Sequence, residues 1–439
     1  MIQARFSPIV IWTHLQGTYW FLPSVVTLAA IFLAVAFTQL DRHAWGADAL
    51  PGWFYGGGAD GARALLSAVA GSIITVVAVT FSVTIVALTV ASQHFGPRLL
   101  NSFMRDRPAQ LVLGTFIGTF AYCLVVLRTV QGDGDGYSVF VPHLAVTAAL
   151  ALTLVSVAAL IYYVHHVAVS LQVSEIARAV TSNLEEAIDR LYPEHFGADA
   201  GPDQPLPKPP ADAVDVPFNS SGYVQRLEGG RVLEAAVKAD VVVWLRVRPG
   251  DFATEGLPVA VAAPPPRDPD AFARQLNGAI VLGADRTDQQ DAGFPLQQLV
   301  EVSLHALSTG INEPFTAVTC IDRIGQGLAR LATRRIPSPL RADDGGHVRV
   351  ITPLDSFRDL LDKSFDPIRA HATGSPVVGG HLLEVLSRIA TVAQRAEDRA
   401  AIRRQADLVL VSMAEWRQDP SVKEQMENAR AKVERAAPA

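Results

Sequence analysis

Four long apolar stretches constrain the fold of this chain more than any other feature of its sequence. A helix that crosses the hydrocarbon core of a bilayer needs about 20 mainly apolar residues. Stretches of this kind occupy about residues 20–40, 64–90, 111–130 and 141–164. We therefore expect a mainly α-helical membrane protein with about four transmembrane helices within residues 1–170.

The rest of the chain has the composition of a soluble protein. Residues 171–196 carry an apolar stripe at helical spacing, which predicts an amphipathic helix that either forms a stalk or lies against the soluble part. Pro, Ala and Asp dominate residues 197–217, as in a linker. Strand and turn signals in residues 218–264 predict a small α/β module. Helical periodicity predicts a mainly helical domain over residues 265–439.

The arginines of the short loops indicate the orientation in the membrane, because Lys and Arg favour the cytoplasmic side. Six of them lie before the first stretch, after the second or after the fourth: Arg5, Arg98, Arg105, Arg107, Arg178 and Arg190. Two lie between the first and second stretches: Arg42 and Arg63. This bias predicts a bacterial inner-membrane protein with both termini and the soluble part in the cytoplasm.

The second apolar stretch carries a stripe of hydroxyl and small apolar side chains. At alternating three- and four-residue steps it contains Ser72, Thr75, Val79, Ser82, Val86 and Thr89. Thr80 and Thr84 lie beside it. Such a face can line a wet path built by several copies, with the valines as apolar constrictions. It can equally serve helix packing, because Ser and Thr let helices approach closely.

Two further patterns suggest contacts. Gly114 and Gly118 form a small-xxx-small ridge in the third stretch, which predicts close helix packing. In the soluble part, the turn that carries Ser308, Asn312 and Thr316 precedes a helix for which Asn312 is the expected N-cap, so it is a candidate ligand or anion turn. The alternative is a plain capped turn, with residues 285–291 as a solvated surface loop.

Several functional classes lack support in the sequence. We find no nucleophile–base pairing, phosphate-cradling glycine loop or metal-ligand spacing, so we expect no enzyme, cofactor or metal. The net charge is −6 and no long basic block occurs, which argues against nucleic-acid binding. No Asp, Glu, Lys or Arg lies in the middle of an apolar stretch, which argues against a proton-driven carrier. Cys123 and Cys320 are expected to be packed thiols.

Several short segments together resemble one bacterial family of predicted integral membrane proteins, domain of unknown function 2254. These segments are Phe81–Thr84, Phe95–Arg98, Leu113–Phe116, Tyr122–Arg128, His165–His166 and Ser308–Ala317. Thr309 and Glu313 depart from the Pro and Asp expected in relatives. The resemblance implies an integral membrane protein and no assigned activity or site residue.

The function favoured by these patterns is an oligomeric ion channel or small-solute pore gated by the cytoplasmic part. The expected partners are other copies of the chain, membrane lipids, and ions or a small ligand. A non-conducting membrane sensor or scaffold is the alternative. A membrane-bound enzyme remains a third class, although no residue pattern supports it.

The predicted orientation can be tested with reporter fusions. Fusions at Asp48 and Asp135 should report the periplasm, and a fusion at Arg105 should report the cytoplasm, because the arginine-rich loops stay inside. A phosphatase reporter that is active outside and a fluorescent reporter that folds inside give complementary readings at each position. The reverse pattern at all three positions would overturn the orientation.

Overall fold

The computed structural model describes residues 20–44, 54–95, 106–132, 139–170, 172–192, 206–415 and 419–437. The chain divides into two compact units, Met1–Gln172 and Val173–Ala439. Each unit is described by itself. The predicted fold class is confirmed: the chain is mainly helical, with four helices that can span a membrane and a smaller region of strands.

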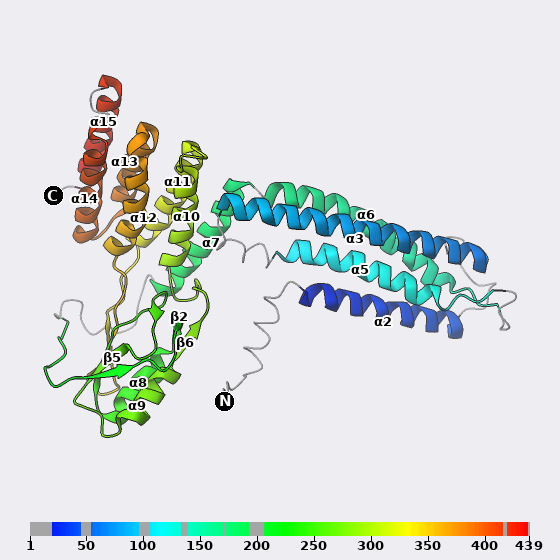
Figure 1. Ribbon diagram of the computed structural model, residues 1–439, viewed down its shortest axis with the longest axis horizontal. Helices are drawn as coiled ribbons and strands as arrows, with labels where there is room; N and C mark the ends of the chain where they lie inside the picture. Colours follow the sequence, from blue (N-terminus) through cyan, green and yellow to red (C-terminus); the bar gives the residue numbers. More distant parts are fainter. Residues whose placement is uncertain are drawn as a thin grey trace. The chain divides into compact units, whose positions relative to one another are not determined.

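The first unit contains four helices that are long and apolar enough to cross a membrane. They are α2 (Phe21–Ala44), α3 (Ala59–Phe95), α5 (Arg107–Leu127) and α6 (His143–Ser170). All four run side by side (Figure 1). They match the four predicted stretches; α3 continues as a helix beyond both predicted ends, and α6 continues beyond its predicted C-terminal end.

Helix α5 lies at the centre of this bundle, since it packs most extensively against α2 and α3, also contacts α6 and is the most buried of the four. In the most apolar part of α5, 56% of the residues are buried, whereas only 11% are buried in the corresponding part of α3. Phe116 and Tyr122 fill the interior, and the Tyr122 hydroxyl donates to the Ala145 carbonyl oxygen of α6 at 2.9 Å. Each outer helix therefore keeps one face on α5 and turns another face away from the bundle.

A buried carboxylate joins two of the outer helices. Asp41, near the end of α2, accepts hydrogen bonds from the backbone N–H groups of Leu144 at 3.1 Å and Ala145 at 3.0 Å. These groups belong to the first turn of α6, where the helix leaves its N–H groups without intrahelical acceptors. The carboxylate also faces the positive end of the α6 dipole. Asp41 thus caps a helix that begins about a hundred residues later.

The second unit combines a helical part with a region of strands (Figure 1). Its helices are α7 (Val173–Leu191), α8 (Gly229–Ala239), α9 (Pro269–Gly278), α10 (Gly293–Ala306), α11 (Pro314–Ala332), α12 (Phe357–His371), the 3-10 turn η3 (Ala372–Gly374), α13 (Pro376–Val392), α14 (Ala396–Ser412) and α15 (Pro420–Ala436). Its strands are β1 (Val214–Pro217), β2 (Gly222–Leu227), β3 (Val242–Leu245), β4 (Phe252–Ala253), β5 (Pro258–Ala263), β6 (Ile280–Gly283), β7 (Leu340–Ala342) and β8 (Val348–Ile351).

The strands form two small sheets, ordered β1-β5-β3-β8-β7 and β4-β2-β6. The α/β region is therefore larger than residues 218–264, because it includes β6 and takes β7 and β8 from the middle of the helical part. The prediction of a linker over residues 197–217 is wrong at its end, where β1 pairs with β5 through Val214 and Ala262. Residues 197–205 lie outside the described part.

Helix α7 lies against α10 and α11 of its own unit. Leu184 and Ile188 are buried, and Gly327 of α11 leaves room for Leu184, since a Cβ there would lie 2.2 Å from its Cδ2. Asp189 accepts from Arg330 at 2.6 Å and from Arg334 at 2.7 Å. Of the two alternatives for residues 171–196, the structure thus shows the helix packed on the soluble unit; residues 171 and 193–196 are not described.

We predict that Asp41→Ala lowers the stability of the membrane unit. The substitution leaves the Leu144 and Ala145 N–H groups without their acceptor, which typically costs about 1–3 kcal/mol. Thermal unfolding of the purified protein in one detergent should then show a lower Tm. Asp60→Ala is the matched control, because the Asp60 side chain is fully exposed and lies 3.9 Å from Arg63. Equal Tm values for both variants would contradict the capping role.

Candidate functional site

The hydroxyl stripe of α3 lies on the exposed side of the membrane unit. Val79 is 57% exposed and Val86 is 62% exposed, and the four hydroxyl residues of the stripe are also exposed. The face of α3 that packs on the bundle carries Ala62, Leu66, Ala70 and Ile73. At about 100° per residue, the stripe lies on roughly the opposite side of the helix. It faces away from α2, α5 and α6.

Three of the four hydroxyls of this stripe are satisfied within α3 itself. Ser72 donates to the Ala68 carbonyl oxygen at 2.8 Å, Thr75 to Gly71 at 3.0 Å and Thr89 to Ile85 at 2.8 Å. Bonds of this kind let Ser and Thr sit on a membrane helix without a partner helix. Their oxygen lone pairs remain available, so the face can meet lipid, another protein surface or water.

The neighbouring threonines have a different role. Thr80 is buried, and Thr84 shares a hydrogen bond of 2.5 Å with the Tyr163 hydroxyl of α6. Tyr163 also donates to the Thr80 carbonyl oxygen at 3.2 Å. These two residues hold α3 to α6, which leaves the stripe as a separate surface on the far side of the helix.

The interior of one membrane unit is closely packed. Phe116, Tyr122 and Cys123 are fully buried, and Thr119 and Ser156 satisfy each other at 3.0 Å. The burial of both Cys123 and Cys320 as free thiols agrees with the sequence prediction. Within the described residues of one copy, the polar stripe therefore does not face this interior, and a path along it needs further copies.

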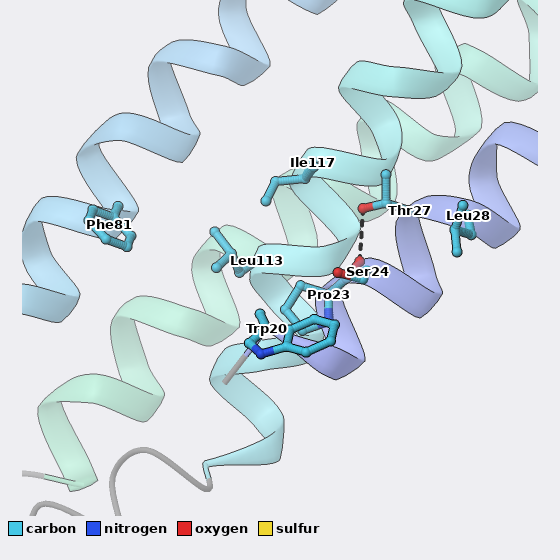
Figure 2. A pocket seen from close by; sticks show the side chains of 8 residues that line it. All are labelled: Trp20, Pro23, Ser24, Thr27, Leu28, Phe81, Leu113 and Ile117. Atoms are coloured by element: carbon cyan, nitrogen blue, oxygen red, sulfur yellow. Dashed lines mark hydrogen bonds between the residues drawn. The ribbon is translucent and has the colours of Figure 1, made fainter. Parts of the chain in front are cut away.

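An apolar cavity of about 500 Å³ opens between α2, α3 and α5. Figure 2 shows Phe81 of α3 across a gap from Leu113 and Ile117 of α5, with Trp20 just before α2 and Leu28 within it. Thr27 is satisfied by the Pro23 carbonyl oxygen at 2.8 Å. The lining is mainly apolar, so an acyl chain or an apolar side chain from another helix suits it better than a polar ligand.

The glycine ridge of α5 faces α2. A Cβ at Gly114 would lie 3.0 Å from the Pro23 Cα, and one at Gly118 would lie 3.2 Å from the Ala30 Cβ. Both distances are tighter than ordinary van der Waals contact. The two glycines therefore let the α2 and α5 backbones come close together.

The turn between α10 and α11 differs from the prediction in one respect. Asn312 adopts a left-handed φ of 50°, and Glu313 rather than Asn312 is the N-cap of α11. Thr316 donates to the Glu313 carboxylate at 3.1 Å, and Ser308 donates to the His305 carbonyl oxygen at 2.7 Å. A carboxylate already lies at the start of α11, and it would repel a bound anion there.

At the end of the membrane unit, His166 Nε2 lies 2.7 Å from Asp106 Oδ2. The adjacent His165 is exposed. Throughout the described residues, no three His, Cys, Asp or Glu side chains form a group that could hold a metal ion.

A charged cleft in the soluble unit was not predicted from the sequence. It has a volume of about 280 Å³ and is lined by the end of α7, the sheet and the segments that carry Asp291 and Asp355. Arg248 contacts Asp355 at 2.6 Å. Arg286 contacts Asp291 at 2.6 Å. The first pair links the turn after β3 to the segment before α12, and the second lies within the segment before α10.

Asp291 shows that the prediction of a solvated loop over residues 285–291 is wrong at its last residue. It is only 5% exposed, and burial raises its pKa although Arg286 opposes the shift. Gly250 makes room for it, with a φ of +95° and a site where a Cβ would lie 2.2 Å from Asp291 Oδ2. A glycine in a predicted turn opposite a polar loop was the available signal, but a sequence does not show which loops meet.

Comparisons with known proteins agree with the membrane architecture. The sequence profile of a family described as predicted membrane protein, domain of unknown function 2254, matches residues 16–388. Uncharacterised proteins of Mycobacterium tuberculosis and Mycobacterium bovis are similar to this chain, each 33% identical over 405 residues, which is 90% of this chain and 76% of the relative. No solved structure matches. The resemblance seen in the sequence is confirmed, and the chain belongs to this family of predicted membrane proteins.

Proposed function

We propose that this membrane protein is the subunit of a homo-oligomeric pore, in which α3 of each copy turns its hydroxyl stripe to a shared axis. The observation that carries the proposal is the placement of Ser72, Thr75 and Ser82 on the side of α3 opposite its own bundle. Polar side chains in a bilayer usually face a protein interior or a water-filled cavity. One copy supplies neither at this face, whereas a ring of copies supplies both.

The chemistry of the stripe suits a path without fixed charge. Hydroxyl oxygens replace part of the hydration shell of a passing ion or solute, and rings of valine close a narrow pore by excluding water. Val79 and Val86 are the two apolar members of the stripe, and more than half of each residue's surface is exposed. We assign them to two such constrictions, with Ser82 between them.

The same proposal places the chain in a bacterial inner membrane with both termini in the cytoplasm, where the soluble unit controls opening. It assigns lipids to the apolar cavity between α2, α3 and α5, and it assigns no catalytic activity or cofactor to the chain. A non-conducting sensor or scaffold is the second candidate. The observation that favours it is the satisfaction of the stripe hydroxyls within α3, which suits a dry contact between copies.

Conductance measurements in reconstituted bilayers test the pore. Val79→Ser and Val86→Ser should each increase leak, because a hydroxyl weakens an apolar constriction; a barrier lower by about 1.4 kcal/mol gives about a tenfold higher rate. Ser82→Leu should decrease conductance. Val155→Ser on α6 is the matched control, since Val155 is 54% exposed but lies outside the stripe. If wild type and every variant stay silent under all voltages, tensions and ions applied, the pore is excluded.

Cysteine cross-linking in native membranes separates the two candidates from a monomer. Val79→Cys should form disulfide-linked dimers, while Val164→Cys on α6, which is similarly exposed, should not. The natural thiols do not interfere, because both are buried and burial raises the pKa of Cys320 to about 12. Cross-linking without conductance supports the scaffold, and absence of cross-linking contradicts both.

A further inference from the structure

Phe315, in the first turn of α11, is a large apolar side chain that the soluble unit leaves uncovered. It is 74% exposed, the same fraction as Phe32 on the membrane helix α2. Val377, in the first turn of α13, is 47% exposed. Ile311, in the turn before α11, is half-buried. Together Ile311, Phe315 and Val377 are named the apolar tip.

The three side chains of the apolar tip share one end of the helical part, because α11 and α13 run in the same direction. Asp322 of α11 lies 2.9 Å from His381 of α13. About one turn later on each helix, Gly325 packs against Val385. The first turns of α11 and α13 are therefore neighbours. Exposed apolar groups that gather at one end of a soluble domain indicate a surface for protein or membrane.

Helix α7 also begins at this end. Gln326 of α11 donates to Glu185 of α7 at 2.8 Å, and one turn later on both helices Arg330 donates to Asp189 at 2.7 Å. The two helices therefore run in the same direction. Glu185 and Gln326 hold the same position, twelve residues past the first, in helices that begin at residues 173 and 314. The start of α7 is thus level with the start of α11 and with the apolar tip.

The chain ties this end of the soluble unit to a membrane helix. Two residues separate Ser170, the last residue of α6, from Val173, the first residue of α7. An extended chain covers at most about 3.6 Å per residue, so this connection spans about 11 Å at most. The strands adjoin the other end of α7, where Leu191 and Leu245 line one cleft. They follow the 19 residues of α7, which make about 28 Å of helix.

The turn before α11 holds the apolar tip in a fixed conformation. The N–H groups of Asn312 and Glu313 donate to the carbonyl oxygens of Ser308 at 2.9 Å and Ala306 at 2.8 Å. The exposed neighbours of the tip include small uncharged residues: Thr309, Gly310, Thr373 and Gly374. The Glu313 carboxylate would repel an anionic headgroup, so the attraction of this surface to a bilayer is apolar rather than electrostatic.

We infer that the apolar tip inserts into the membrane surface, at the boundary between lipid headgroups and acyl chains. Apolar side chains gain free energy by leaving water at this depth, while the polar groups of the surrounding turns stay among the hydrated headgroups. The short connection from α6 favours lipid as the occupant, because it keeps the start of α7 close to a bilayer. The inference goes beyond the proposed pore and does not depend on conduction by α3.

Fluorescence quenching on the full-length protein in phosphatidylcholine nanodiscs tests this inference. A bimane label on Phe315→Cys or Val377→Cys should lose fluorescence when the lipids carry a nitroxide near the top of an acyl chain, because insertion by about 5–10 Å brings the label to that depth. Phe252→Cys is the matched control, since Phe252 of β4 is 58% exposed but lies among the strands. Its label should be quenched by iodide in the water instead. Unsubstituted protein is the labelling blank, because Cys123 and Cys320 are buried.

A second substitution separates insertion from mere closeness to the bilayer. With the label on Val377→Cys, adding Phe315→Ser should reduce quenching by the lipid nitroxide, because burial of a phenylalanine side chain shifts an equilibrium by about tenfold or more. Adding Phe252→Ser should leave the quenching unchanged. Tip labels quenched by iodide alone would be in water, and tip labels quenched by neither agent would be covered by protein; either result overturns the inference. Unchanged lipid quenching after Phe315→Ser would also overturn it.

Discussion

The close contact between α2 and α5 is the interaction on which the membrane unit depends. Hydrophobic burial supplies little force between helices that already lie in lipid, so close van der Waals packing and hydrogen bonds must hold them. Gly114 and Gly118 allow that packing, and Asp41 fixes the end of α2 to the start of α6. With α5 enclosed by three neighbours, α3 has one face on the bundle and its hydroxyl stripe on the other.

This arrangement accounts for both candidate activities of the first unit. If the stripe faced the other helices of its own bundle, it would serve only as a packing surface. Because it points outward, it needs either lipid or another copy of the chain. Its hydroxyls bond within α3, so lipid does not destabilise it strongly, while its small side chains permit close approach of a second α3. In the proposed pore, association and a lined path would both be consequences of the same helix face.

The second unit has its own organisation. Helix α7 belongs to it through the buried Leu184 and Ile188 and the ion pairs of Asp189 with α11. The same helix ends at the charged cleft, where Arg190 joins Arg248 and Arg341.

Sequence patterns predicted those parts that depend on local composition. The four membrane helices follow from the length and apolarity of single stretches, and strands β2 to β5 lie within residues 218–264, where strand and turn signals predict an α/β module. Features that depend on distant partners were missed. Asp41 caps α6 through the N–H groups of Leu144 and Ala145, which lie 103 and 104 positions later in the chain. Strand β1 contains Asp215 and Pro217 and is specified mainly by its pairing with β5. Asp291 is buried only because Arg286 and Gly250 meet it in the fold.

The most direct test of the account is the structure of the assembled protein in lipid, determined by electron cryomicroscopy. The account predicts several copies around one axis, with Ser82 and Val86 of each α3 facing that axis and the Gly114–Gly118 ridge still covered by α2. A single copy whose α3 stripe is covered by lipid, or an assembly in which α3 lies at the periphery, would contradict it.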